Sequence, residues 1–214
     1  MRGILITLEG IDGSGKTTVA SILTHKLPEA RSQRHFVFTA EPTIGEAGKL
    51  LRSHLADKSH DTSEEISRAR RIQELSLFMA DHADHLAKTV IHELDKGSVV
   101  ISDRYADSTT AYQGVTLRGI IPEPLDWIRD IYRPWNVVPD RTLFFSVEPM
   151  EAIRRLRARE NMEKFERLEF LKEVDSNFRK ITALEPERFV TIDAQKESDR
   201  VVEDALDAIL EIIG

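Results

Sequence analysis

The segment Gly10–Thr17, with the sequence GIDGSGKT, constrains the fold of this chain more than any other feature. It fits the phosphate-loop pattern G-x-x-x-x-G-K-[ST] at every fixed position. The apolar run 4–8 before it is typical of a buried strand, and residues 18–24 after it are typical of the first turns of a helix. In such a strand–loop–helix unit, the pattern predicts a loop that binds the phosphates of a nucleoside triphosphate.

Each part of this loop has a physical role in that prediction. Glycines allow backbone N–H groups to turn towards phosphate oxygens, and the N-terminus of the following helix adds partial positive charge. Lys16 is expected to contact the β- and γ-phosphates, and the Thr17 hydroxyl is expected to bind Mg²⁺. The predicted nucleotide-binding residues are Gly10, Ile11, Asp12, Gly13, Ser14, Gly15, Lys16, Thr17 and Thr18.

The composition indicates a globular protein. Of the 214 residues, 41% are hydrophobic and 31% are charged, and the absence of cysteine excludes disulfides and thiol nucleophiles. The net charge of −7 argues against a nucleic-acid duplex as a partner. No apolar run reaches the length of a membrane span, and the first strand begins right after residue 3. We therefore expect no membrane partner and no signal peptide, and we predict a cytoplasmic location.

Apolar runs of strand type alternate with helical patterns along the chain. Strands are predicted at 4–8, 36–39, 98–102, 141–146 and 188–192, and helices at 15–27, 45–56, 63–95, 105–113, 123–131, 148–158, 166–183 and 198–213. This alternation predicts an α/β fold, a P-loop NTPase three-layer sandwich with a parallel five-stranded sheet flanked by helices. We expect a single domain over 1–214.

A second cluster of chemically active side chains follows the predicted strand 98–102. Asp103 and Arg104 stand at its carboxyl end, where ligands bind in open α/β sheets. A carboxylate there can hold Mg²⁺, and a guanidinium can hold a phosphate through two parallel hydrogen bonds. A helix N-cap for Asp103 and a surface ion pair for Arg104 are the alternatives, but beside a phosphate loop we favour the functional roles. Glu9 and Glu41 end the first two strands and should line the same crevice.

The basic segment 150–170 allows two interpretations. A solvated helix with charge pairs four residues apart explains the pattern. A mobile lid that carries arginines also explains it, because phosphoryl transfer needs cations near the developing charge and needs water excluded. The charge pattern alone favours the solvated helix.

Four segments together resemble the thymidylate kinase family, and the similarity covers nearly the whole chain. They are Glu9–Thr18, Glu41–Thr43 with Gly48–Arg52, Leu77–Asp81, and Asp103–Gly114. The resemblance implies transfer of the γ-phosphoryl group of ATP to dTMP, giving dTDP and ADP, with Mg²⁺ as cofactor, in dTTP biosynthesis. It also implies a homodimer in which helices of the two copies pack together.

The resemblance assigns a role to each residue of the acceptor site. Asp12 would accept a hydrogen bond from the 3′-hydroxyl of dTMP, Phe78 would stack on thymine, and Arg104 would hold the acceptor phosphate. Tyr112 would fill the space beneath the sugar and exclude a 2′-hydroxyl, with Gln113 supporting it. The predicted substrate-binding residues are Asp12, Glu41, Pro42, Arg52, Phe78, His82, Arg104, Ser108, Thr109, Tyr112 and Gln113.

Near the base, where Ser108 and Thr109 are expected to approach its edge, the chain departs from the family's pattern. Ala40 and His82 stand where the family often has arginines, and the usual Glu-Pro-Gly-Gly-Thr is shortened to Glu-Pro-Thr. A neutral imidazole at His82 can still donate one hydrogen bond to the base, or His82 can be a packed helix residue. These departures bear on base selectivity rather than on phosphoryl transfer.

The position of segment 157–167 matches the family's lid, which reverses the preference for a solvated helix. The predicted catalytic residues are Lys16, Arg104, Arg157 and Arg159, and Lys164 is a further candidate for a lid cation. Some family members carry a catalytic arginine at the position of Gly13. Because this chain does not, its lid should supply the cation for the transition state.

Two other functions are compatible with the residues. The same fold serves kinases of other nucleoside monophosphates or of deoxynucleosides, which acceptor preference would distinguish. A nucleotide-binding switch or sensor would turn over slowly and respond to a partner protein, but no segment of the chain is suited to that role.

Overall fold

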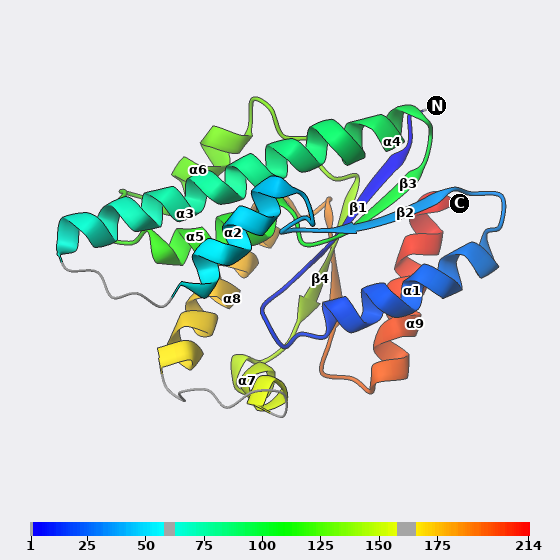
Figure 1. The fold of residues 1–214 in the computed structure, drawn as a ribbon. Coiled ribbons are helices and arrows are strands. Elements are labelled where there is room, and N and C mark those ends of the chain that lie inside the picture. The colour runs from blue at the N-terminus through cyan, green and yellow to red at the C-terminus, as the bar shows by residue number, and fades with distance from the viewer. Residues whose placement is uncertain (1, 58–62, 158–165) are drawn as a thin grey trace.

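The computed structural model describes residues 2–57, 63–157 and 166–214. Within these ranges the strands form one sheet, with every neighbouring pair parallel, in the order β2-β3-β1-β4-β5 (Figure 1). The strands are β1 (Ile4–Glu9), β2 (Phe36–Ala40), β3 (Val99–Asp103), β4 (Arg141–Ser146) and β5 (Phe189–Asp193). The predicted parallel five-stranded sheet is therefore confirmed, with each strand end within a residue of its predicted place.

Helices connect successive strands, as parallel pairing requires. They are α1 (Lys16–Ala30), α2 (Glu46–Ala56), α3 (Glu64–His85), η1 (Leu86–Val90), α4 (Ile91–Asp95), α5 (Ala106–Thr116), α6 (Pro124–Tyr132), α7 (Pro149–Arg157), α8 (Glu166–Leu184) and α9 (Ser198–Ile213). The single helix predicted over 63–95 is present as α3, η1 and α4, because a π-helical turn interrupts it after His85. None of the helices in the described ranges is long and apolar enough to cross a membrane.

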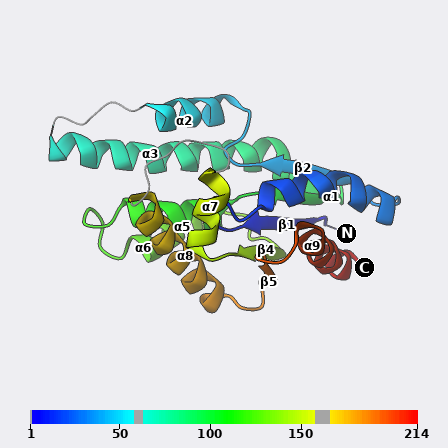
Figure 2. The same cartoon turned by 90° about the horizontal axis from the view of Figure 1, so that it is seen from below.

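Side chains on alternate positions of the strands bury themselves in two hydrophobic clusters, as period-two geometry requires. Ile6 of β1 belongs to a cluster with residues of α1, α8 and α9, whereas its neighbour Leu5 belongs to one with residues of η1, α4 and α6. Figures 1 and 2 place α1 beside α9, and α2 alongside α3. The sheet is thus covered by helices, which is the predicted sandwich.

The carboxyl ends of the central strands bring polar residues together. In the sheet, Leu8 lies opposite Asp103, and Ala40 lies opposite Asp103 from the other side. Glu9 is the last residue of β1 and Glu41 comes directly after β2, and these two strands lie on either side of β3. The predicted crevice residues share one edge of the sheet, and the phosphate loop leaves β1 at that edge.

Candidate functional site

The phosphate loop connects β1 to α1, and Lys16 is the first residue of that helix. Lys16 is buried, and its Nζ donates a 3.4 Å hydrogen bond to the carbonyl oxygen of Ile11 within the loop. Burial, and then the positive charge of Arg104, lower the pKa of Lys16 to about 8. The Ser14 hydroxyl is buried in the same loop and has no protein partner. The loop therefore holds a cation and a polar group that an anionic ligand can satisfy.

Gly13 brings the phosphate loop into contact with α7. Its φ is +86°, and a Cβ built there would lie 2.4 Å from the carbonyl oxygen of Ala152 in α7. No side chain fits at this position without moving one backbone segment. The absence of an arginine at position 13, noted in the sequence, thus has a steric reason in this fold.

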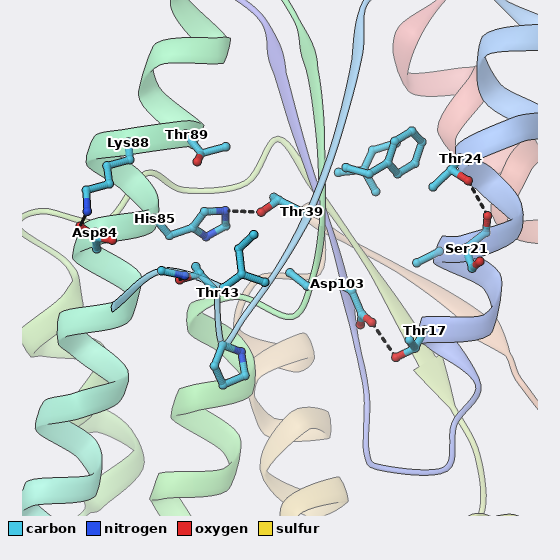
Figure 3. Close-up of a pocket in the computed structure, with 17 residues that line it drawn as sticks. Thr17, Ser21, Thr24, Thr39, Thr43, Asp84, His85, Lys88, Thr89 and Asp103 are labelled. Atoms are coloured by element: carbon cyan, nitrogen blue, oxygen red, sulfur yellow. Dashed lines mark hydrogen bonds and ion pairs between the residues drawn. The ribbon is translucent and has the colours of Figure 1, made fainter. Parts of the chain in front are cut away.

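Thr17 and Asp103 form the candidate metal site. The Thr17 hydroxyl donates to Asp103 Oδ2 at 2.6 Å, and Figure 3 shows the two side chains facing each other from α1 and the end of β3. The second carboxylate oxygen, Oδ1, is buried and unpartnered. Hydroxyl and carboxylate oxygens suit Mg²⁺, whose coordination shell usually also contains several waters and oxygens of the substrate phosphates. In the described ranges no group of three or more His, Cys, Asp or Glu could hold a metal by itself.

Arg104 joins the phosphate loop to α5. Its φ of 71° is unusual for a residue with a side chain, and its guanidinium contacts the phosphate loop. Nη2 lies 2.5 Å from Asp12 Oδ1, and Nη1 donates to Ser108 Oγ at 2.8 Å. The Ser108 hydroxyl in turn donates to buried Glu9, whose pKa burial and the Asp107 carboxylate raise to about 8. A continuous set of polar contacts thus fixes the arginine.

A cavity of about 600 Å³ opens beside this arginine. It is lined by residues that the sequence placed in the acceptor site: Asp12, Pro42, Phe78, Arg104, Ser108, Thr109, Tyr112 and Gln113. They come from the phosphate loop, the β2–α2 loop, α3, the β3–α5 loop and α5. The volume suits a small organic ligand.

Tyr112 forms part of the cavity wall. Its hydroxyl accepts a 2.8 Å hydrogen bond from the backbone N–H of Asp12, and the Arg104 guanidinium carbon lies 5.1 Å from its ring centre. Burial raises the pKa of Tyr112 to about 12, so the phenol stays neutral at physiological pH. The ring is therefore held in one place by the same loop that carries the phosphate-binding backbone.

Gln113 lines the cavity and carries a buried acceptor without a partner. Its Nε2 donates to Glu74 Oε1 at 2.6 Å, while its Oε1 is buried and has no partner. The sequence did not identify Glu74 or Phe170, although both line the cavity. Glu74 stands one helical turn before Phe78 on α3, so helical spacing could have revealed it. Phe170 comes from distant α8, and no sequence signal pointed to it.

Three predicted substrate-binding residues lie elsewhere. His82 is fully buried: its Nδ1 is 2.8 Å from Glu41 Oε1 and its Nε2 is 2.9 Å from Asn136 Oδ1. Both ring nitrogens and Glu41 are thereby engaged inside the protein, so the expected contact of His82 with the base is corrected. Arg52 is also placed differently, because it donates to the backbone carbonyls of Pro42 and Thr43.

The predicted lid lies mainly outside the described residues. Arg159 and Lys164 fall in the segment 158–165, which the structure does not describe. Arg157 is the last residue of α7 and is exposed. Its role as a catalytic cation stays a prediction.

This chain is similar in sequence and in fold to thymidylate kinases. The family model described as thymidylate kinase matches residues 8–205. The probable thymidylate kinase of Methanosarcina barkeri is 45% identical over 100% of this chain and 99% of its own length. The probable thymidylate kinase of Halobacterium salinarum is 43% identical over 98% of this chain and 97% of its own length. A crystal structure of thymidylate kinase from Ehrlichia chaffeensis, 28% identical, matches with a TM-score of 0.72 over 98% of this chain and 100% of that one.

Proposed function

This chain belongs to the thymidylate kinase family and phosphorylates dTMP in nucleotide biosynthesis, and from this premise we propose how its residues divide the reaction. ATP, the phosphate donor of the family, binds on the phosphate loop, and dTMP binds in the adjoining cavity. The observation that carries this division is the single set of contacts through Asp12, Arg104 and Ser108, which joins the two places. The reaction is ATP + dTMP → ADP + dTDP.

On the donor side, Lys16 and the loop backbone hold the β- and γ-phosphates. Thr17 and Asp103 would hold Mg²⁺, and the unpartnered Asp103 Oδ1 supports this assignment. Mg²⁺, when bound, neutralises phosphate charge and so assists departure of ADP. Lys16 is only partly protonated near pH 8 without nucleotide, and triphosphate binding favours its charged form.

On the acceptor side, Arg104 turns from its contact with Asp12 to hold the dTMP phosphate. That releases Asp12 to accept a hydrogen bond from the 3′-hydroxyl, and Tyr112 occupies the space that a 2′-hydroxyl would need. No general base is required, because the attacking phosphate oxygen is already anionic. The residues accelerate the reaction by positioning the two phosphates and by neutralising charge.

The base lies between Phe78, which stacks on it, and α5. Thymine N3–H is a donor, and Gln113, whose Oε1 is buried without a partner beside the cavity, would turn this acceptor towards the base. Thr109 completes the polar edge. Gln113 thus takes over the base recognition first expected of His82.

The cation for the transition state is Arg157 or Arg159, in the lid at about 157–167. The lid and the rest of the chain form a single domain of residues 1–214. The contact of Gly13 with Ala152 supports this proposal, because it leaves no room for a loop arginine. A homodimer and a cytoplasmic location are further proposals. The resemblance to the family supports the homodimer, and the lack of cysteine suits a reducing compartment.

The decisive experiment measures ADP release with ATP and Mg²⁺ for a series of acceptors. We expect fast turnover with dTMP, slower turnover with dUMP, and little with UMP, dCMP, dGMP or AMP. UMP tests the exclusion of the 2′-hydroxyl by Tyr112, and dUMP tests the contribution of the methyl group. Faster turnover with any other acceptor than with dTMP would contradict the assignment of the cavity.

Replacing Gln113 with leucine should raise KM for dTMP by about tenfold or more and change KM for ATP little, because a buried donor of the base loses its acceptor. Steady-state kinetics with each substrate varied in turn measures both constants. Gln73→Leu, an exposed change on α3, is the matched control. An unchanged KM for dTMP in Gln113→Leu would show that Gln113 does not contact the base.

A further inference from the structure

The segment Glu41–Thr43 contributes Pro42 to the wall of the acceptor cavity and is held in place by contacts with helix α3. Pro42 lines both that cavity and a second one of about 680 Å³, which also contains Thr17 and Asp103 (Figure 3). The backbone N–H and the hydroxyl of Thr43 both donate to Asp81, at 2.8 Å and 2.6 Å. The position of this segment therefore affects the shape of the acceptor site.

Helix α2 approaches the same segment closely. A Cβ built at Gly48 would lie 2.0 Å from the carbonyl oxygen of Thr43, so this contact requires glycine. Because α2 packs tightly against one side of Glu41–Thr43, this segment can move only if the contacts on its other side change.

The contacts on the other side are made by two histidines of α3. His82 Nδ1 and His85 Nδ1 lie 2.8 Å and 2.7 Å from the same carboxylate oxygen, Glu41 Oε1. His85 Nε2 lies 2.9 Å from the Thr39 hydroxyl, which can donate, so a neutral His85 satisfies both of its contacts (Figure 3). The contacts of His85 therefore do not require a positive charge on its ring beside the buried Glu41 carboxylate.

His82 is different, because both of its partners are acceptor oxygens. Its second nitrogen, Nε2, lies 2.9 Å from Asn136 Oδ1. A neutral imidazole has one N–H, whereas an imidazolium has two and can donate to both oxygens. The geometry of His82 therefore corresponds to the charged form, in which it is the counter-ion of Glu41.

Aromatic rings enclose this ion pair. The ring centres of Tyr105, Tyr132 and Trp135 lie 4.5 Å, 5.1 Å and 5.4 Å from that of His82, each at a steep angle to it. The enclosure excludes water, so the charges are screened little and the pair is sensitive to loss of either partner.

Titratable groups face His82 from several elements. They are Glu41 after β2, Asp81 and His85 on α3, Tyr105 after β3, and Tyr132 on α6. Burial alone would lower the pKa of His82, but the charge of Glu41, the hydrogen bonds to Glu41 and Asn136, and the charge of Asp81 together outweigh burial and raise this pKa above its usual value. While Glu41 is ionised, the pair stabilises the fold fully below about pH 6.5, and this contribution is lost as the pH rises through the raised pKa of His82.

We propose that His82 is a positioning residue for the acceptor: as an imidazolium paired with Glu41, it fixes the segment Glu41–Thr43 and thereby the cavity wall formed by Pro42. The proposal rests on the proposed acceptor site. It gives the His82 position, where the family often has an arginine, a role in acceptor affinity without contact with the base.

The first test is a substrate-free NMR titration of the histidine rings in the whole protein, with His82 assigned by comparison with His82→Gln. We expect both ring nitrogens of His82 to carry protons at pH 7. A neutral His82 at that pH, with an unprotonated Nε2, would overturn the proposal. This readout is independent of catalysis, so it does not depend on the acceptor.

The second test separates binding from chemistry. His82→Gln is expected to raise KM for dTMP about tenfold while kcat and KM for ATP change little, because only the cavity wall is displaced. In the wild type, KM for dTMP should rise at alkaline pH as His82 loses its proton, and in the variant it should not vary with this step. Equal KM values for dTMP in the two proteins would refute the positioning role.

Two further variants serve as a second test and as a control for this comparison. Asn136→Asp places a carboxylate against His82 Nε2 and keeps the imidazole. It should move the alkaline rise in KM for dTMP to higher pH. This variant tests the proposal even if His82→Gln folds poorly. His92→Gln, at an exposed site on α4, should leave all constants unchanged. An Asn136→Asp profile that does not move would count against the proposal. A wild type without dTMP-dependent turnover would instead refute the proposed function.

Discussion

Replacing Lys16 with methionine should lower kcat for dTMP phosphorylation about 10³-fold, because the buried cation that meets the transferring phosphate is lost. Lys16 is the first residue of α1, and its Nζ already lies inside the loop, so the change alters charge more than shape. ADP release with saturating ATP and dTMP measures the effect. Circular dichroism should show an unchanged fold.

The lowered pKa of Lys16 adds a second signature of the same role. Because this pKa is about 8 in the free protein, ATP binding at pH 8.5 should be accompanied by uptake of protons. Calorimetry in two buffers with different ionisation enthalpies detects that uptake, which should vanish in Lys16→Met. Lys26→Met, at an exposed position of α1, is the control. A loss of kcat below tenfold in Lys16→Met would show that the lysine does not act on the transferring group.

Replacing Arg104 with lysine should lower kcat/KM for dTMP about 10²-fold, because lysine keeps the charge but loses the fork of donors. In the free protein that fork reaches Asp12 with one nitrogen and Ser108 with the other. Arginine and lysine at position 104 bear the same cost of a φ of 71°, so backbone strain cancels when the two proteins are compared. KM for ATP should change little.

The matched control is Arg118→Lys, which alters an exposed ion pair with Glu173. Exposed pairs of this kind contribute little, so its kinetics should equal those of the wild type. If Arg104→Lys raised KM for ATP as much as KM for dTMP, the arginine would belong to the donor site and the division of roles proposed here would be wrong.

Local sequence was sufficient for the phosphate loop and for the sheet. The eight residues Gly10–Thr17 are consecutive, and their strand and helix follow from the pattern of neighbouring residues. The meeting of Thr17 with Asp103 could also be expected, because parallel strands end at the same edge of a sheet. The resemblance to a family then pointed to α5 and α3 as the walls of the acceptor site.

Partner choice inside the protein could not be predicted in this way. Phe78 and His82 are one turn apart on α3, and the family resemblance implied that both face the base. In the fold, Phe78 lines the cavity while His82 turns to Glu41 and Asn136, which come from distant parts of the chain. A helical period gives the face of a helix to within a wide angle, and it does not say which neighbour a polar side chain will find.

The sequence by itself determined that this chain binds nucleoside triphosphates on a parallel sheet, because a phosphate loop and buried strands depend on residues that are adjacent in the chain. Only the tertiary structure decided that Gln113 keeps a buried oxygen without a partner and that Glu41 is buried between two histidines. These features depend on the packing of α3 against α5 and against the β2–α2 loop. A buried polar group must find its partner among whatever the fold brings near it, and that choice is made by contacts between segments far apart in sequence.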